Sequence, residues 1–318
     1  MKPEYQHLFG PVPSRRLGRS LGVDLTPFKT CTLDCVFCQL GRTTHKTLAR
    51  RAYVPSGSVR KELRTWVRGG GQADYVTLSG SGEPTLHTRF GDILRLAREE
   101  TGLPSVLLSN GTLFWLPRVC EAACQADIVK LSLSAWDRPL FEQINRPHPG
   151  LNFSRILEGY RRFRDQFLGR LWLEVFLVAG INAIPDEAGK IAELAARIAP
   201  DEIHLNTAVR PPAEAFVLPL PRKEMEALAA LFTPAATVIA EFTPGAGGDL
   251  AAREGAILAM LERRPCTAIQ IARAFGMHRN EVSKYVGNLS RTGKLRICKS
   301  GGASHYTAAP GTGKHSRT

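Results

Sequence analysis

The sequence predicts an α/β protein in which a partial barrel of six β/α units, (β/α)6, precedes a C-terminal winged helix-turn-helix domain. Six short β-rich runs alternate with stretches whose apolar residues recur at helical spacing, which predicts parallel strands joined by right-handed crossovers. The loops after these runs are rich in glycine and polar residues, as expected at the catalytic rim of a barrel. The hydrophobic pattern then changes after residue 250, which predicts a second domain.

The predicted strands and helices of the barrel are short and alternate regularly. In the stretch 88–100, for example, Phe90, Ile93, Leu94 and Ala97 share one helical face. The predicted strands are residues 21–25, 75–79, 105–109, 128–134, 171–178 and 202–207. The main predicted helices between them are residues 58–68, 88–100, 153–167 and 185–198.

The predicted domain boundaries place the barrel at residues 1–240 and a glycine- and proline-containing linker at 241–250. Residues 251–309 form the predicted winged helix, and the Gly-rich basic tail 310–318 is predicted to be disordered. The order helix, helix, turn, helix, hairpin supports this second domain, and Thr267 is the expected cap of its second helix. Its elements are predicted at residues 252–261, 267–275, 278–292, 294–298 and 304–307.

The composition indicates a cytoplasmic protein with no membrane partner. Of the 318 residues 43% are hydrophobic, but no uninterrupted apolar run approaches the ~18 residues of a membrane span, and no apolar signal core follows Met1. Three of the seven cysteines fall within eight residues, unlike the spacing of a secreted disulfide framework. Thiolates that hold a metal must stay reduced, which fits the cytoplasm.

Positive charge is concentrated at both ends of the chain, and the net charge is +13. Residues 1–60 hold 10 Lys/Arg against 3 Asp/Glu, residues 61–248 hold 20 against 22, and residues 249–318 hold 12 against 4. This distribution predicts a polyanionic partner such as nucleic acid, RNA in particular. The alternative is that the basic surfaces only aid solubility.

Three closely spaced cysteines, Cys31, Cys35 and Cys38, predict an iron–sulfur centre, because thiolates are the usual ligands of such clusters. A [4Fe–4S] cluster normally takes four cysteines. Three leave one iron open to the amino and carboxylate groups of S-adenosylmethionine. A zinc site with His45 as fourth ligand is the alternative.

The spacing Cys-x-x-x-Cys-x-aromatic-Cys, which includes Phe37, resembles the hallmark of the radical S-adenosylmethionine (radical SAM) superfamily, and the match extends from about residue 17 to about residue 209. The resemblance implies a TIM-like barrel and a [4Fe–4S] cluster held by the three cysteines. It also implies reductive cleavage of S-adenosylmethionine to a 5′-deoxyadenosyl radical, which abstracts hydrogen from a substrate. A low-potential electron donor of the flavodoxin or ferredoxin type is the implied partner.

Further motifs follow the cysteines in the order expected from the resemblance. The run Ser79-Gly80-Ser81-Gly82-Glu83-Pro84 is similar to a Gly-Gly-Glu element, with Ser81 in place of the first glycine. Residues 109–111 resemble a Thr-Asn-Gly element, and residues 178–182 resemble an element near the adenine. No catalytic residue is assigned. The residues implied to bind the cofactor are Phe37, Gly80, Ser81, Gly82, Glu83, Ser109, Asn110, Ser132, Ser134 and Asn182, with Lys130 as an alternative contact.

Residues 10–22, 31–41 and 204–212 resemble proteins grouped with the tRNA wybutosine-precursor (4-demethylwyosine) synthases, which modify a guanosine of tRNA. Those enzymes hold a second cluster through upstream cysteines, whereas this chain has no cysteine before Cys31. Cys120 and Cys124 share a predicted helix face and are expected to be buried small hydrophobes. The resemblance therefore implies the radical machinery and a large anionic substrate, not the wybutosine reaction itself.

Several polar residues are candidates for substrate contacts, each with a structural alternative. Arg15, Arg16 and Arg19 are expected to bind substrate phosphates or to form ion pairs at the barrel edge. His204 and Asn206 share one face of a strand, where a hydrogen-bonded core histidine is the alternative. In the second domain the candidates for nucleic-acid contacts are His278, Arg279, Asn280, Lys284 and Arg291 on the third helix, with Lys294, Arg296 and Lys299 beside the wing.

Two other functions remain open from the sequence. The first is radical modification of a protein, a peptide or a small molecule, with the winged helix docking a peptide. The second is an iron–sulfur transcription regulator that binds DNA through the winged helix. The regulator leaves the polar loops of the barrel rim without a role.

Overall fold

The computed structural model describes residues 5–14, 16–208, 212–239, 248–263, 265–275, 277–300 and 303–309. The chain divides into two compact units: residues 1–208 with 212–242, and residues 209–211 with 243–318. No helix in the described ranges is long and apolar enough to cross a membrane.

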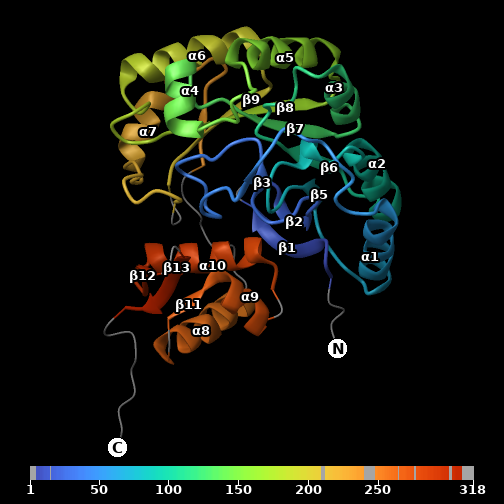
Figure 1. Cartoon of the computed structure of the whole chain (residues 1–318), viewed down its shortest axis with the longest axis vertical. Helices are drawn as coiled ribbons and strands as arrows, with labels where there is room; N and C mark the ends of the chain where they lie inside the picture. Colours follow the sequence, from blue (N-terminus) through green and yellow to red (C-terminus); the bar gives the residue numbers. More distant parts are fainter. Residues whose placement is uncertain are drawn as a thin grey trace, which may run out of the picture. The chain divides into compact units, whose positions relative to one another are not determined.

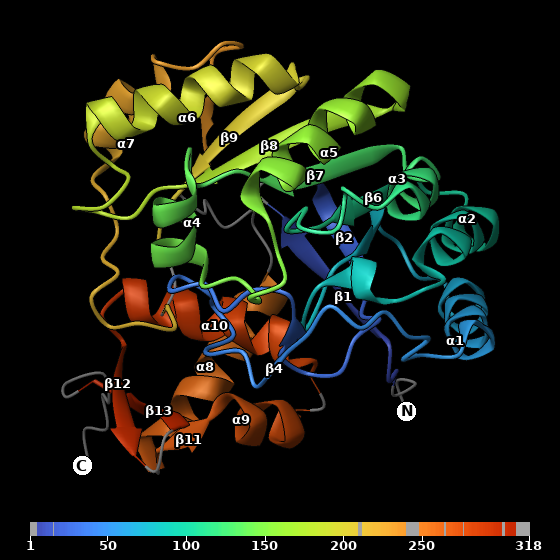
Figure 2. The same cartoon turned by 45° about the horizontal axis from the view of Figure 1, so that its top comes forward.

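The first unit is built on one eight-stranded sheet with the order β1-β2-β5-β6-β7-β8-β9-β10. All neighbours from β2 to β10 are parallel, whereas β1 pairs antiparallel with β2. The sheet curves, and helices lie along its outer side (Figures 1 and 2). The strands are β1 (Leu8–Ser14), β2 (Gly18–Val23), β5 (Tyr75–Leu78), β6 (Ser105–Leu108), β7 (Ile128–Ser132), β8 (Arg170–Phe176), β9 (Glu202–Asn206) and β10 (Thr237–Val238).

The helices connect successive strands and bury one face each. In α5, Ile156, Tyr160 and Phe163 are buried at helical spacing. Side chains of Asp137 and Asn152 accept backbone N–H groups and so cap α4 and α5. The helices are α1 (Ser56–Arg68), α2 (Phe90–Thr101), α3 (Pro117–Ala123), α4 (Arg138–Asn145), α5 (Phe153–Gln166), α6 (Pro185–Ile198) and α7 (Arg222–Ala229), with a 3-10 turn, η1 (Pro84–Leu86).

All six predicted strands are present, but the first was predicted at residues 21–25 and is instead β2, which ends at Val23. The cause is Asp24: its carboxylate accepts hydrogen bonds from the Thr26 amide and from Ser81, so the chain leaves the sheet there. Neither β1 nor β10 is predicted from the sequence. β1 contains two prolines, which strands tolerate mainly at an edge, and β10 has only two residues.

The turn between β1 and β2 closes one end of the curved sheet's interior. Leu17, from this turn, packs against Val106 of β6, Ile128 of β7 and Trp172 of β8. These three residues lie near the starts of their strands, so Leu17 closes the end of the interior that is opposite to the strands' carboxyl termini. Polar side chains therefore gather at the other end, as in other barrels.

The described residues of the second unit form three helices and one antiparallel sheet of order β11-β13-β12. Its core includes Ile257, Ile271, Val282 and Tyr306. Thr267 and Gln270 exchange hydrogen bonds at the start of α9, which confirms the predicted cap. The elements are α8 (Gly248–Arg263), β11 (Cys266–Thr267), α9 (Ala268–Phe275), α10 (Arg279–Arg291), β12 (Leu295–Ser300) and β13 (Ala303–Ala308).

The order of these elements follows the prediction, with β11 as an addition. The predicted linker 241–250 is too long, because α8 already begins at Gly248. The rest of that linker and the predicted tail 310–318 lie outside the described residues.

Candidate metal centre

The three predicted cysteine ligands lie on one loop that follows β2. Cys31 belongs to β3 (Thr30–Cys31), which pairs with β4 (His45–Lys46). The loop is fastened to the end of α4, because the amides of Asp34 and Val36 donate to the carbonyls of Asn145 and Ile144. Two segments far apart in the sequence thus shape one thiol-bearing loop.

Each of the three sulfurs accepts a hydrogen bond from one side-chain N–H group. Asn110 Nδ2 lies 3.4 Å from Cys31 Sγ, Asn145 Nδ2 lies 3.2 Å from Cys35 Sγ, and Lys29 Nζ lies 3.0 Å from Cys38 Sγ. Such donors stabilise negative charge on sulfur, which a metal-bound thiolate carries. The donor set therefore fits a thiolate-ligated iron–sulfur cluster. Of these three donors, only Asn110 is predicted from the sequence: a lysine two positions before Cys31 is a weak signal, and Asn145 gives none.

Burial raises the pKa of the Cys31 thiol to about 12, with a further rise from the Glu83 carboxylate. Burial is also the main cause of the raised pKa of Cys35. Binding of iron must therefore displace protons from these thiols. His45, the alternative zinc ligand, is exposed on β4. In the described part of the chain, no three Cys, His, Asp or Glu side chains converge on a point suited to one metal ion.

The loop after β5 packs directly on the cysteine loop, and two glycines make the close approach possible. A Cβ at Gly82 would lie 1.8 Å from the Thr30 carbonyl oxygen, and one at Gly80 would lie 2.3 Å from the Asp24 carboxyl carbon. Ser81 takes the place of a glycine without strain of its own: its Oγ donates to Asp24 Oδ2 at 2.5 Å, and its carbonyl accepts the Lys29 amide.

Glu83 is buried and ties this loop to the end of β6. Its Oε1 accepts hydrogen bonds from the Thr85 amide, the Thr85 hydroxyl and the Ser109 hydroxyl, and its Oε2 accepts the Asn110 amide at 2.8 Å. Four donors position this carboxylate. In this structure Glu83 therefore orients Ser109 and Asn110, the two neighbouring residues also predicted to bind the cofactor.

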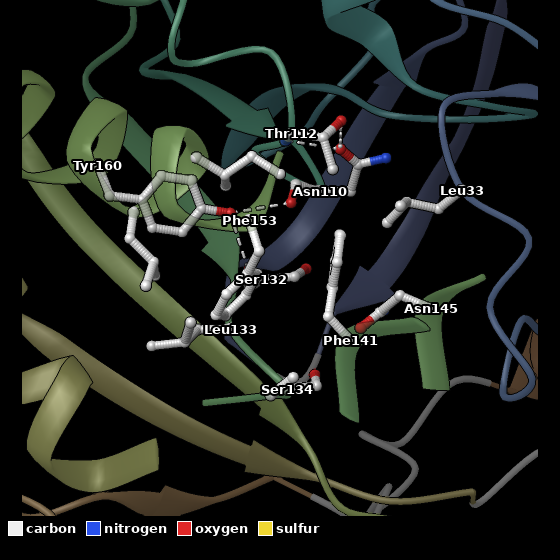
Figure 3. Close-up of a pocket in the computed structure, with 13 residues that line it drawn as sticks. Leu33, Asn110, Thr112, Ser132, Leu133, Ser134, Phe141, Asn145, Phe153 and Tyr160 are labelled. Atoms are coloured by element: carbon white, nitrogen blue, oxygen red, sulfur yellow. Dashed lines mark hydrogen bonds between the residues drawn. The ribbon is translucent and has the colours of Figure 1, made fainter. Parts of the chain in front are cut away.

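A pocket adjoins the cysteine loop at the carboxyl ends of the strands (Figure 3). Asn110 and Asn145, the donors to Cys31 and Cys35, both line it, together with Ser132 and Ser134. Ser132 is the last residue of β7, whereas Ser134, predicted within the strand 128–134, lies two residues beyond its end. Tyr160 forms part of the wall, and its hydroxyl lies 3.0 Å from the Asn110 carbonyl and 2.9 Å from the Ser132 carbonyl. A small ligand in this pocket would lie beside the two residues whose side-chain amides donate to Cys31 and Cys35.

Three other predicted contacts are engaged within the protein. Ser134 Oγ accepts the Phe176 amide, and the Asn182 side chain bonds to the backbone of Val178, Ser134 and Phe176. Phe37 stacks on the ring of Phe176 with centroids 3.9 Å apart. All three side chains thus interact with Phe176, the last residue of β8, and of the three Ser134 also lines the pocket.

Inside the curved sheet, Glu174 of β8 lies between two cations. Its Oε2 is 2.9 Å from Arg16 Nη1 and 3.3 Å from Lys130 Nζ, and Asn206 donates to its Oε1. Lys130 and Arg16 hold the pKa of Glu174 well below its usual range, against the opposing effect of burial. Lys130 and Arg16 thus form ion pairs. Arg19 forms an exposed pair with Asp74, and Arg15 lies outside the described residues.

His204 matches the structural alternative. Its Nε2 lies 3.1 Å from Glu202 Oε2, its ring packs edge-on against Trp172, and burial lowers its pKa to about 4. It is therefore a neutral core histidine near pH 7. Cys120 is buried as predicted, and its thiol donates to the Phe114 carbonyl, whereas Cys124, also predicted to be buried, is only half-buried.

A sequence model of the radical SAM superfamily matches residues 25–195, more than half of the chain. The chain belongs to the radical SAM superfamily, whose members are enzymes that use a [4Fe–4S] cluster and S-adenosylmethionine. Among its relatives are proteins named UPF0026. One from Methanocaldococcus jannaschii is 36% identical over 213 residues, which cover 66% of each chain. One from Synechocystis is 34% identical over 212 residues, which cover 66% of this chain and 78% of that protein.

A protein named GTPase Obg from Brachyspira hyodysenteriae is 31% identical over 299 residues, which cover 93% of this chain and 44% of that protein. The chain thus spans less than half of this relative, and 66% of the Methanocaldococcus one. A radical SAM methyltransferase from Sphaerobacter thermophilus shares the fold, with a TM-score of 0.54 and 20% identity over 71% of this chain and 67% of that one.

Proposed function

We propose that Cys31, Cys35 and Cys38 hold the cluster, that S-adenosylmethionine occupies the pocket of Asn110, Asn145 and Ser132, and that the resulting radical abstracts hydrogen from an RNA substrate. The observation that carries the first half is the shared position of Asn110 and Asn145, which donate to cysteine sulfurs and also line the pocket. When bound, the cluster supplies the electron that cleaves the sulfonium of S-adenosylmethionine and yields a 5′-deoxyadenosyl radical.

The residues of this chain would hold and shield the reactants. Asn110 keeps its amide in place through Thr32 Oγ1 at 2.9 Å and through Thr112, whose amide and hydroxyl both donate to Asn110 Oδ1. Apolar side chains such as Phe141 and Phe153 line the rest of the pocket. Such a wall excludes water, which protects a radical from side reactions.

We also propose that the second unit is a winged helix that binds the nucleic acid. Its order of helices and strands supports this assignment, and residues 249–318 hold 12 Lys/Arg against 4 Asp/Glu. Arg291, Lys294 and Arg296 are exposed around the end of α10 and the start of β12. Phosphate contacts from such residues position a protein on nucleic acid. The resemblance of residues 10–22, 31–41 and 204–212 to tRNA-modifying proteins favours RNA.

The experiment for the radical chemistry is anaerobic. The full chain is reconstituted with iron and sulfide, reduced, and given S-adenosylmethionine, and 5′-deoxyadenosine is measured. We expect slow formation that disappears in Cys35→Ala and persists in Cys120→Ala. A well-formed cluster without any cleavage, or stoichiometric zinc in place of iron, contradicts the proposal.

The experiment for the substrate measures binding of the full chain to labelled tRNA across a salt series. Combined replacement of Arg291, Lys294 and Arg296 by alanine should weaken binding by about tenfold and flatten its salt dependence. Replacement of Arg95, Arg138 and Arg197, which are exposed on the first unit, is the matched control. No binding to RNA favours a peptide or small-molecule substrate, whereas redox-dependent binding to a DNA duplex favours a regulator.

We further propose a cytoplasmic location and a flavodoxin- or ferredoxin-type electron donor. All seven cysteines are free thiols, which fits a reducing compartment. Coupled reduction of the cluster by purified flavodoxin or ferredoxin tests the donor class.

A further inference from the structure

We propose that Lys29 is a positioning residue for electron transfer: its buried ammonium group stabilises the reduced cluster and thereby raises the cluster's reduction potential. The inference depends on the three cysteines holding the cluster, and it does not depend on which substrate the radical attacks. It assigns a role to a side chain that no sequence motif marks.

The backbone of Lys29 is held by hydrogen bonds to two other segments, the loop after β5 and the strand β4. Its amide donates to the Ser81 carbonyl at 2.7 Å, and its carbonyl accepts the His45 amide at 3.1 Å. Its φ of 59° lies in the left-handed region, which non-glycine residues seldom adopt. The surrounding loops therefore hold Lys29 in an unfavourable backbone conformation, a feature that clusters at functional sites.

The charge of Lys29 has an unusual environment. The residue is 3% exposed, and Nζ lies 3.0 Å from Cys38 Sγ. Within the described ranges, no carboxylate lies within 4.0 Å of Nζ, although lysine is almost never fully buried without a partner. Lys46, on the adjacent strand β4, is exposed and donates to the carbonyls of Arg146 and Pro147 instead.

The missing partner is a negative charge at sulfur. Three thiolates on a [4Fe–4S]²⁺ cluster carry a net charge of about −1, and a one-electron reductant of low potential makes it about −2 without forming or breaking a bond. A fixed positive charge close to the sulfurs lowers the energy of the more negative state by more than that of the less negative one. Lys29 should therefore favour reduction, and the neutral donors Asn110 and Asn145 should contribute in the same direction but less.

The test is a redox titration of the reconstituted full chain, with the reduced cluster followed by electron paramagnetic resonance. Lys29→Met removes the charge and the donor, Lys29→Gln removes the charge but keeps an N–H donor, and Lys29→Arg keeps both. Lys46→Met is the matched control. At the wild-type midpoint, we expect the ratio of reduced to oxidised cluster to fall by about tenfold in the Met and Gln variants. It should change little in the Arg variant and in the control.

An unchanged midpoint in the Gln variant, with the Met variant alone shifted, would show that only the hydrogen bond matters and would overturn the charge argument. Unchanged midpoints in both neutral variants would overturn the whole proposal. Only chains that carry a cluster give the signal, so a variant with reduced iron content still reports its midpoint. Failure of the wild type to bind any cluster would count against the metal centre itself, which separates that outcome from a failure of the Lys29 proposal.

Discussion

Asn145, the last residue of α4, donates a hydrogen bond from its side-chain amide to Cys35 Sγ across 110 positions of the sequence. The same residue lines the pocket, and its backbone carbonyl accepts a hydrogen bond from the Asp34 amide. One side chain and its backbone thus join the thiol loop, α4 and the pocket.

Replacement of Asn145 by leucine should impair assembly of the cluster more than folding. A hydrogen bond to a charged group is worth about 1.5–3 kcal/mol, and this one acts on the metal-bound thiolate. We expect lower iron content and faster loss of visible absorption in air. Asn152→Asp, which can keep the cap of α5, is the control. Equal iron content and equal air stability in Asn145→Leu and wild type would contradict a role for this amide.

Gly82→Ala should disrupt the contact between the two loops. Its Cβ would lie 1.8 Å from the Thr30 carbonyl oxygen, a backbone atom that has little freedom to move. We expect a loss of several kcal/mol in unfolding free energy, roughly the range of severe steric mutations, together with loss of iron binding. Denaturant unfolding and iron analysis measure both.

Gly189→Ala is the control for Gly82→Ala. Gly189 lies in α6, and nothing lies within 4 Å of a Cβ added there. Alanine favours a helix over glycine by about 1 kcal/mol, so this variant should be slightly more stable than wild type. A Gly82→Ala variant as stable as Gly189→Ala would show that the loops separate easily.

Glu83→Gln should destabilise the apo protein by about 2 kcal/mol. One carboxylate oxygen would be replaced by an NH2 group, which is itself a donor and cannot accept the hydrogen bonds that this oxygen accepts. Four donor groups point at this buried carboxylate. The affinity for S-adenosylmethionine should fall as well, since Ser109 and Asn110 lose their anchor. Glu99→Gln, at an exposed position, is the control. Calorimetric binding that is unaltered in Glu83→Gln would remove this residue from the site.

Stability should fall between pH 6.5 and pH 5 because of His204. Burial lowers its pKa to about 4 in the folded chain, whereas an unfolded histidine titrates near 6.5. The unfolded state therefore binds more protons in this window, and the free energy of unfolding decreases as the pH falls, by about 2 kcal/mol at most. Below the folded pKa the effect levels off.

His204→Gln should show a weaker pH dependence than wild type over the same window. His87 contributes with the same sign, because burial also lowers its pKa, so the difference between the two proteins isolates His204. Urea unfolding of the apo protein at pH 6.5 and 5 gives the values. Parallel curves for wild type and His204→Gln would refute the assignment of a neutral His204.

Much of the fold could be predicted because its signals are local. The apolar periodicity of stretches such as 153–167 reproduces α5 closely, and every predicted strand exists. The end of β2 could not be predicted, because it depends on a bond between Asp24 and Ser81, which are 57 residues apart. β1 could not be predicted either. Its prolines argue against a strand unless it lies at the edge of a sheet, and the order of strands in the sheet is known only from the tertiary structure.

The candidate site divides in the same way. The three cysteines are visible in the sequence because the cluster requires its ligands on one loop. Glu83 and Asn110 are visible because each belongs to a short motif that follows a predicted strand. The hydrogen bonds of Ser134 and Asn182 and the ring stacking of Phe37 are not visible in the sequence. Each of these contacts involves Phe176 at the end of β8, which only the fold brings close.

The sequence by itself therefore determined the alternation of strands and helices and the chemistry of the thiol loop, since both depend on residues close together in the chain. The tertiary structure alone decided that Lys29, Asn110 and Asn145 each donate to one sulfur. The physical reason is that these donors come from three different segments, and only the packing of the loops and α4 around the interior brings them within hydrogen-bonding distance.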